Sequence, residues 1–179
     1  SVLRSAAAAM AADPEWADPL RREEFSVVVR RAALDAHSSR PWAARVAERI
    51  GVRLAPAETV SILLATRRPE QLAFALRQVA KQQVPGGAEL VLAAHGFAPD
   101  PGVVRDHLGD RPVTVLTPGA DTLFGAVLAQ ATAAAAGEVV VKFDDDDWYG
   151  ADVVADLLRA RRYSGATLVG MPAEFVYLE

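Results

Sequence analysis

The sequence predicts an α/β domain, with a mostly parallel sheet between layers of helices, preceded by a helical segment. From Val60 onward, short apolar runs alternate with amphipathic stretches of helical periodicity, which is the pattern of strand and helix units in parallel sheets. Residues 1–57 are instead rich in Ala, Arg and Glu, with prolines as breaks. We therefore expect a helical appendage at 1–57 and a sheet domain at 58–179.

Four apolar runs have the length and composition of buried strands. They are rich in Val, Leu and Ala, as expected for strands that are covered on both faces. The runs are 60–65 (VSILLA), 88–94 (AELVLAA), 112–116 (PVTVL) and 138–143 (EVVVKF). A further stretch at 166–178 (ATLVGMPAEFVYL) also has strand character.

The stretches between these runs have helical patterns. Pro69 stands at a favourable first position of a helix, Asp121 is the expected N-cap of another, and Gly165 is the expected end of the last. Helical connections between strands place those strands in parallel. We expect helices at 69–83, 101–108, 121–136 and 150–165.

Composition limits the classes of function. The chain is 51% apolar with a net charge of −4 and a pI near 5.4, so we expect no general attraction to nucleic acid or to anionic membranes. It has no cysteine, which excludes disulfides and thiolate metal sites. Because no apolar run approaches the roughly 20 residues of a membrane span, we expect no transmembrane segment and a cytoplasmic location. The chain starts without Met and ends in a strand-like run, so we expect a piece of a longer protein.

Polar residues follow the ends of the predicted strands. The first run leads to Thr66, Arg67 and Arg68, the second to His95, and the fourth to four aspartates at 144–147. In parallel sheets, ligands bind outside the carboxyl ends of the strands, where these residues would gather. Cations that suit phosphate and carboxylates that suit a metal together suggest a nucleotide with a bridging metal.

The four aspartates directly follow an apolar strand. Their charges repel one another, so we expect a cation to offset them. In an extended chain, Asp144 and Asp146 lie on one face, and Asp145 and Asp147 on the other. A carboxylate pair on one face can hold a hard cation such as Mg²⁺, Ca²⁺ or Mn²⁺. The alternative is a solvated acidic turn.

Other nucleotide and metal motifs do not fit this sequence. No G-x-G-x-x-G follows the first strand, and there is no P-loop. An EF-hand loop that began at Asp144 would need glycine where Tyr149 stands. Response regulators and dehalogenase-like proteins end the first strand in a key aspartate, whereas this chain has Ala65 and Thr66 there.

Three segments, VSILLATRRPEQL, AELVLAAHG and TPGADTLFGAVLAQATAAAAGEVVVKFDDDDWYG, together resemble the amino-terminal half of family 2 glycosyltransferases over about residues 59–179. The shared features are a first strand that ends in Thr with Arg-Pro-Glu shortly after, and an apolar strand that runs into aspartates and an aromatic residue. The resemblance implies the GT-A fold, a Rossmann-like, mostly parallel sheet with helices on both faces. It implies a metal-dependent, inverting glycosyltransferase that takes a sugar from a nucleotide-diphosphate donor, with a UDP-sugar expected, to an unknown acceptor.

The resemblance also implies which residues lie by the nucleotide base. Thr66 and Arg68 would lie by the nucleotide base, with Arg67 nearby. Many relatives end the second strand with two acidic residues before a Gly, one of which reads uracil, whereas this chain has His95 at that point. His95 either replaces that hydrogen bond or is a turn residue. The alternative for the two arginines is a surface pair at the start of a helix.

At the aspartates, the resemblance implies that Asp144 and Asp145 approach the ribose and the sugar. Asp146 would hold Mg²⁺ or Mn²⁺ on the donor diphosphate, and alternation along the chain adds Asp144 as the second metal ligand. Trp148 and Tyr149 would either stack on the sugar or base or pack against the protein.

No general base can be assigned from the sequence. In the family this carboxylate lies well downstream of the aspartates, and here Glu174 and Glu179 are the only carboxylates after Asp156. The chain thus resembles a donor-binding half. Two alternatives are a degenerate domain that binds without turnover and a nucleotidyltransferase, although the Gly-rich, Lys-containing loop usual in the latter is missing from ATRRPEQ.

Residues 10–46 (MAADPEWADPLRREEFSVVVRRAALDAHSSRPWAARV) are similar to the carboxyl-terminal helices of GT-B type glycosyltransferase-like domains. This second resemblance implies that the chain spans a junction between two transferase-like domains.

Overall fold

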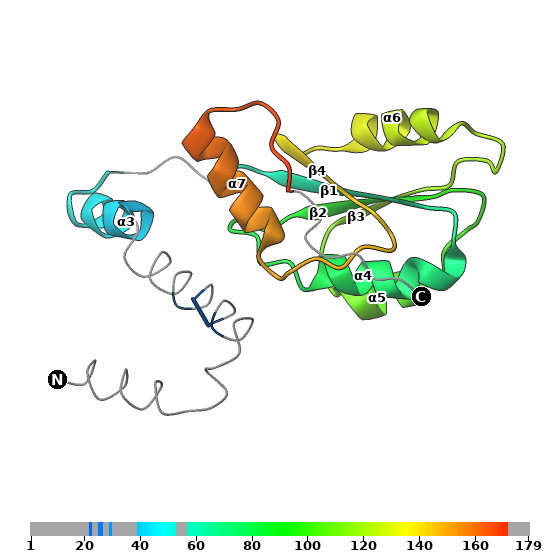
Figure 1. Ribbon diagram of the computed structural model, residues 1–179, viewed down its shortest axis with the longest axis horizontal. Helices are drawn as coiled ribbons and strands as arrows, with labels where there is room; N and C mark the ends of the chain where they lie inside the picture. The colour runs from blue at the N-terminus through cyan, green and yellow to red at the C-terminus, as the bar shows by residue number, and fades with distance from the viewer. Residues whose placement is uncertain (1–21, 23–24, 27–28, 30–38, 53–56, 172–179) are drawn as a thin grey trace. The chain divides into compact units, whose positions relative to one another are not determined.

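The computed structural model describes residues 22, 25–26, 29, 39–52 and 57–171 (Figure 1). The chain divides into two compact units, Ser1–Ala55 and Pro56–Glu179, which we describe separately. In the first unit, helix α3 spans Ser39–Arg49. Most of the segment that resembles a GT-B tail lies outside the described residues. No helix among the described residues is both long and apolar enough to cross a bilayer.

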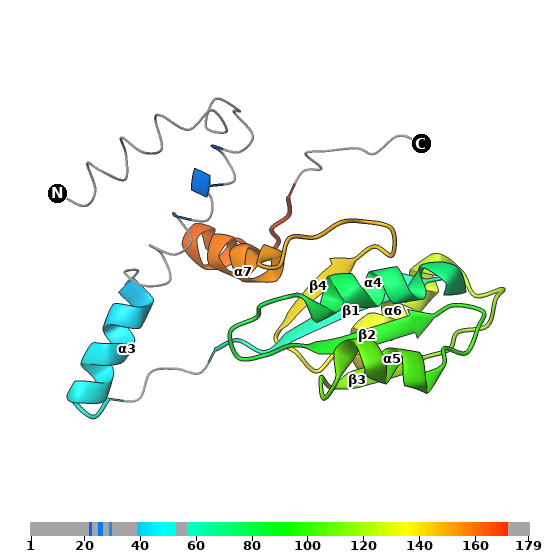
Figure 2. The same ribbon diagram turned by 90° about the horizontal axis from the view of Figure 1, so that it is seen from below.

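The second unit contains a four-stranded sheet in which every strand pair is parallel (Figures 1 and 2). The strand order is β3-β2-β1-β4. Each of the four runs predicted between residues 60 and 143 begins and ends within one residue of an observed strand, which confirms the α/β class. The strands are β1 (Val60–Thr66), β2 (Glu89–Ala94), β3 (Val113–Leu116) and β4 (Val139–Phe143).

Within residues 57–171, five helical elements connect or follow these strands. Pro69 begins a short 3-10 turn that leads into a longer helix, and Asp100 caps α5 through a 2.7 Å hydrogen bond from the Gly102 N–H to its Oδ1. The last helix ends at Gly165 in the left-handed conformation, as expected. The elements are η2 (Pro69–Gln71), α4 (Leu72–Ala80), α5 (Pro101–Leu108), α6 (Phe124–Ala134) and α7 (Val153–Ser164).

One predicted helix start and one predicted strand are wrong. Helix α6 has Leu123, not Asp121, as its N-cap, because Thr122 closes a turn by donating its N–H to Gly119 O at 2.9 Å. Residues 166–171 form no strand, and residues 172–178 of the same prediction lie outside the described residues.

Helices cover both faces of the sheet, which confirms the three layers. Alternate residues of β1 point to opposite faces. Ile62 and Leu64 belong to a core with residues of α4, α5 and α7, whereas Leu63 packs with Val127 and Ala131 of α6. Figure 1 shows α6 on one side of the sheet and α4 and α5 on the other.

Gly137, in the segment before β4, lies close against the backbone of β1. A Cβ built there would lie 2.5 Å from Ser61 N and 2.7 Å from Val60 C, both backbone atoms that cannot move aside. We expect Gly137→Ala to lower the free energy of unfolding by about 1–3 kcal/mol or more, as overpacking does. The matched control is Gly125→Ala in α6, where nothing lies within 4 Å and alanine favours the helix. Urea denaturation of both variants tests this, and equal stability would contradict it.

Candidate functional site

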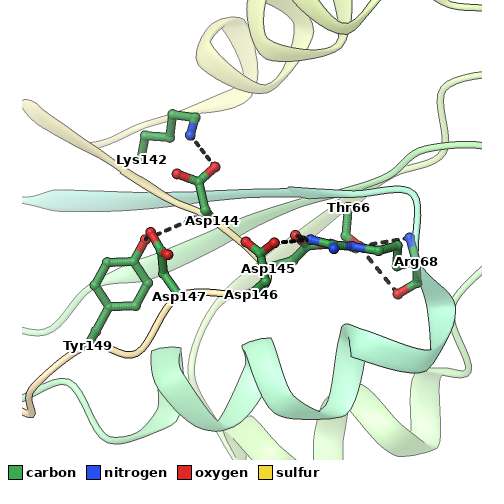
Figure 3. Close-up of polar contacts among 8 residues, drawn as sticks. All are labelled: Thr66, Arg68, Lys142, Asp144, Asp145, Asp146, Asp147 and Tyr149. Carbon is green, nitrogen blue, oxygen red and sulfur yellow. Dashed lines mark hydrogen bonds and ion pairs between the residues drawn. The ribbon is translucent and has the colours of Figure 1, made fainter. Parts of the chain in front are cut away.

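The aspartates lie beside Thr66 and Arg68 because β1 and β4 are neighbours in the sheet. The two strands run parallel, so their carboxyl ends lie at the same edge. Thr66 ends β1, and Asp144 directly follows β4. Figure 3 shows the resulting group of polar side chains, which come from segments about 80 residues apart in the sequence.

One cluster, formed by Thr66, Arg68, Asp145 and Asp146, has Arg68 at its centre; we call it the Arg68 cluster (Figure 3). Arg68 donates from Nε to Asp145 Oδ2 at 3.1 Å and from Nη2 to Asp145 Oδ1. The same Nη2 pairs with Asp146 Oδ2 at 2.8 Å. Thr66 Oγ1 donates to Asp145 Oδ2 at 2.5 Å and accepts the Arg68 N–H at 3.0 Å. A buried carboxylate is thus held in place by a charge-assisted fork and a hydroxyl.

These contacts govern the ionisation of Asp145. Burial raises the pKa of this carboxyl, but the hydrogen bonds from Arg68 and Thr66 outweigh burial and hold the pKa below its ordinary value. In turn, the hydrogen bond to Asp145, followed by that to Asp146, raises the pKa of Arg68. Both groups are therefore charged at neutral pH.

The lowered pKa of Asp145 makes stability depend on pH. A carboxyl with a depressed folded-state pKa adds stability above its unfolded pKa of about 3.9, and this stability is lost as the pH falls through the folded value. We expect the melting temperature of Asp145→Asn to fall less steeply below about pH 4 than that of the wild type. Thermal melts from pH 7 to pH 2 measure this, with exposed Asp106→Asn as the control. Parallel curves for Asp145→Asn and the wild type would contradict it.

The other two aspartates lie in a second group, with Lys142 and Tyr149 (Figure 3). Lys142 Nζ pairs with Asp144 Oδ1. Tyr149 Oη accepts the Asp144 N–H at 2.8 Å and donates to Asp147 Oδ2 at 3.3 Å, and its ring stacks on Phe143 with centroids 3.8 Å apart. Burial first, and then the charge of Asp147, raises the pKa of Tyr149, which keeps this donor protonated. The Tyr149 ring therefore packs against the core, and its hydroxyl holds the loop that carries the aspartates.

Trp148 takes no part in the stack of Phe143 and Tyr149. It is exposed, and the Lys81 ammonium lies 4.4 Å from its ring centroid.

The predicted metal pair, Asp144 and Asp146, is divided between the two groups, because Asp144 contacts Lys142 and Asp146 contacts Arg68. Among the described residues, no three acidic or histidine side chains converge on one point. The exposed Asp146 carboxylate nonetheless fits a hard cation of the Mg²⁺ type, which is bound by one or two carboxylates and completes its shell with phosphate and water.

His95 and Arg67 lie at the same edge without joining the Arg68 cluster. The His95 N–H donates to Thr66 O at 2.8 Å, yet both ring nitrogens are buried and neither has a hydrogen-bond partner among the described residues. Arg67 Nη2 donates to Ala120 O at 3.2 Å. The imidazole is therefore the polar group of this edge that most lacks a partner.

Sequence reasoning missed Lys142. Its signal was a charged residue inside an otherwise apolar strand, two positions before Asp144.

A cavity of about 560 Å³ opens at the opposite, amino-terminal edge of the sheet. Thr59, Glu89, Arg111 and Gly137 are among the residues that line it. It lies away from the aspartates, so it forms no part of the site at the carboxyl edge.

Comparison with known proteins shows a shared fold. Twelve solved chains match, among them the crystal structure of S. aureus TarS 1–349, with a TM-score of 0.51 and 19% sequence identity. The match covers 64% of this chain and only 38% of the TarS chain. No protein-family model matches, and no curated protein sequence is significantly similar. The GT-A-like architecture predicted from the sequence is thus confirmed, and this chain shares the fold of TarS, a family 2 glycosyltransferase.

Proposed function

We propose that residues 58–179 bind a nucleotide-diphosphate sugar, with a UDP-sugar the expected donor, and form the donor half of a metal-dependent, inverting glycosyltransferase. Residues 1–57 are a separate helical appendage in this proposal. One observation carries it: the Arg68 cluster lies at the carboxyl edge of adjacent parallel strands in a GT-A-like fold. That edge is where such sheets bind ligands.

The chemistry follows from the charges at this edge. Breaking the bond between the anomeric carbon and phosphate leaves negative charge on the departing diphosphate. Mg²⁺ or Mn²⁺, if held by Asp146, would supply a Lewis acid for that charge. Asp145, fixed by Thr66, presents a rigid hydrogen-bond acceptor to ribose or sugar hydroxyls. Asp144, the neighbouring residue in the chain, is also an acceptor for ribose or sugar hydroxyls in this proposal.

His95 and Arg67 belong to the base end of the proposed site. The His95 ring carries one donor and one acceptor when neutral, and neither is satisfied within the described chain. A base edge that pairs with this ring would remove the cost of leaving it buried and unpaired. Arg67 lies at the same edge and donates to Ala120 O.

Donor hydrolysis tests whether the chain turns a donor over. A transferase hydrolyses a UDP-sugar slowly to UDP and free sugar when Mn²⁺ is present, and Asp146→Ala abolishes this release. A domain that only binds gives metal-assisted UDP binding without hydrolysis, and a nucleotidyltransferase instead consumes a nucleoside triphosphate. Hydrolysis that survives Asp146→Ala unchanged would refute the site.

A further inference from the structure

Arg68 occupies the carboxylates that the proposed function gives to a metal and a donor. Its fork makes two contacts with Asp145 and one, at 2.8 Å, with Asp146. A guanidinium cannot lose its proton at any ordinary pH, so this cation is permanent. Its single positive charge contacts two of the four neighbouring carboxylates.

The two halves of this contact differ in strength. The Asp145 side chain is 10% exposed, whereas those of Arg68 and Asp146 are 43% and 55% exposed. A nearly buried carboxylate that lost its partner would be left desolvated and unpaired. An exposed ion pair is weak, because water replaces the partner at little cost. The Asp146 contact is therefore the one that can open.

We propose that Arg68 is a resident counter-cation of Asp146, and that a divalent ion displaces its Nη2 from Asp146 while its contacts with Asp145 stay. The inference rests on the proposed metal site. Two cations at one carboxylate repel each other, so the ion and the guanidinium compete for Asp146. Arg68 thus lowers the affinity for a free metal ion. A diphosphate that arrives with the ion brings negative charge, which the Arg68 N–H freed from Asp146 can contact.

Titration of the whole chain with Mn²⁺, without nucleotide, tests this competition. The electron paramagnetic resonance signal of the free ion measures how much Mn²⁺ is bound. Arg68→Gln is expected to bind Mn²⁺ about three- to tenfold more tightly than the wild type, because one competing charge is gone. Arg68→Lys keeps a charge but cannot span two carboxylates, so its affinity should lie between the two. The control is Arg105→Gln, which removes a charge from the exposed side of α5 and should leave the affinity unchanged.

The inference would be overturned if a folded Arg68→Gln variant, as shown by its melting curve, bound Mn²⁺ as tightly as the wild type or more weakly. If Arg68→Gln does not fold, Arg68→Lys takes its place in this comparison. The failure of the proposed function gives a different result. If Arg68→Gln binds Mn²⁺ more tightly but no diphosphate binds any variant, the competition stands and the donor site does not. If the wild type binds UDP with Mn²⁺ and the variants do not differ in Mn²⁺ affinity, the donor site stands and the competition does not.

Discussion

Replacing Phe143 by alanine is expected to lower the free energy of unfolding by about 3–5 kcal/mol, the usual cost of removing a buried phenyl ring. Phe143 is 2% exposed, ends β4 and belongs to the larger core cluster. Its ring also stacks on Tyr149, with an interplanar angle of 12°. Removing the ring therefore leaves a cavity and also frees the tyrosine that holds the aspartate loop. Urea denaturation monitored by circular dichroism measures the change.

The control for this prediction is Phe124→Ala, which makes the same chemical change at the start of α6. Phe124 is 50% exposed, so its loss should cost less than about 1 kcal/mol. Similar losses of unfolding free energy in the two variants would show that the Phe143 ring does not stabilise the core as we describe.

Asp146→Asn is expected to remove most of the metal-dependent affinity for UDP, by at least about tenfold. Asparagine keeps the size of the side chain but not the charge that a hard divalent ion requires. The same change breaks only an exposed contact with Arg68, so stability should change by less than about 1 kcal/mol. Isothermal titration with UDP in the presence and absence of Mn²⁺ measures the loss.

Asp106→Asn on α5 is the matched control for that titration, because Asp106 is exposed and belongs to neither group at the carboxyl edge. If Asp146→Asn keeps the full affinity of the wild type in Mn²⁺, Asp146 does not hold the metal.

The strands could be predicted because their signal is local. Each is a short apolar run that both faces of a sheet can bury, and each is bounded by turn residues. The run after Gly165 has the same composition but forms no strand within residues 166–171, and Leu168 and Met171 are exposed there. A strand needs a neighbour with which to exchange hydrogen bonds, and composition alone does not supply one.

The position of the site at the sheet edge could be predicted from the sequence, but the pairs that its side chains form could not. That Thr66, Arg68 and the aspartates share one edge follows from parallel strands. The pairing of Arg68 with Asp145 and Asp146 depends on β1 lying next to β4, a non-local fact that no local pattern carries. The alternation rule grouped Asp144 with Asp146, but β4 ends at Phe143, so the aspartates lie beyond the ladder that enforces alternation.

The most direct test of the central claim is a thermal-shift series with UDP, GDP, CDP, dTDP and ADP, each with and without Mn²⁺. A ligand that binds only the folded chain adds about 2.7 kcal/mol of stability at a hundredfold excess over its dissociation constant. Our account predicts that at least one diphosphate, with UDP expected, raises the melting temperature only when Mn²⁺ is present. No shift with any diphosphate, or the same shift without Mn²⁺, would contradict a metal-dependent donor site at the Arg68 cluster.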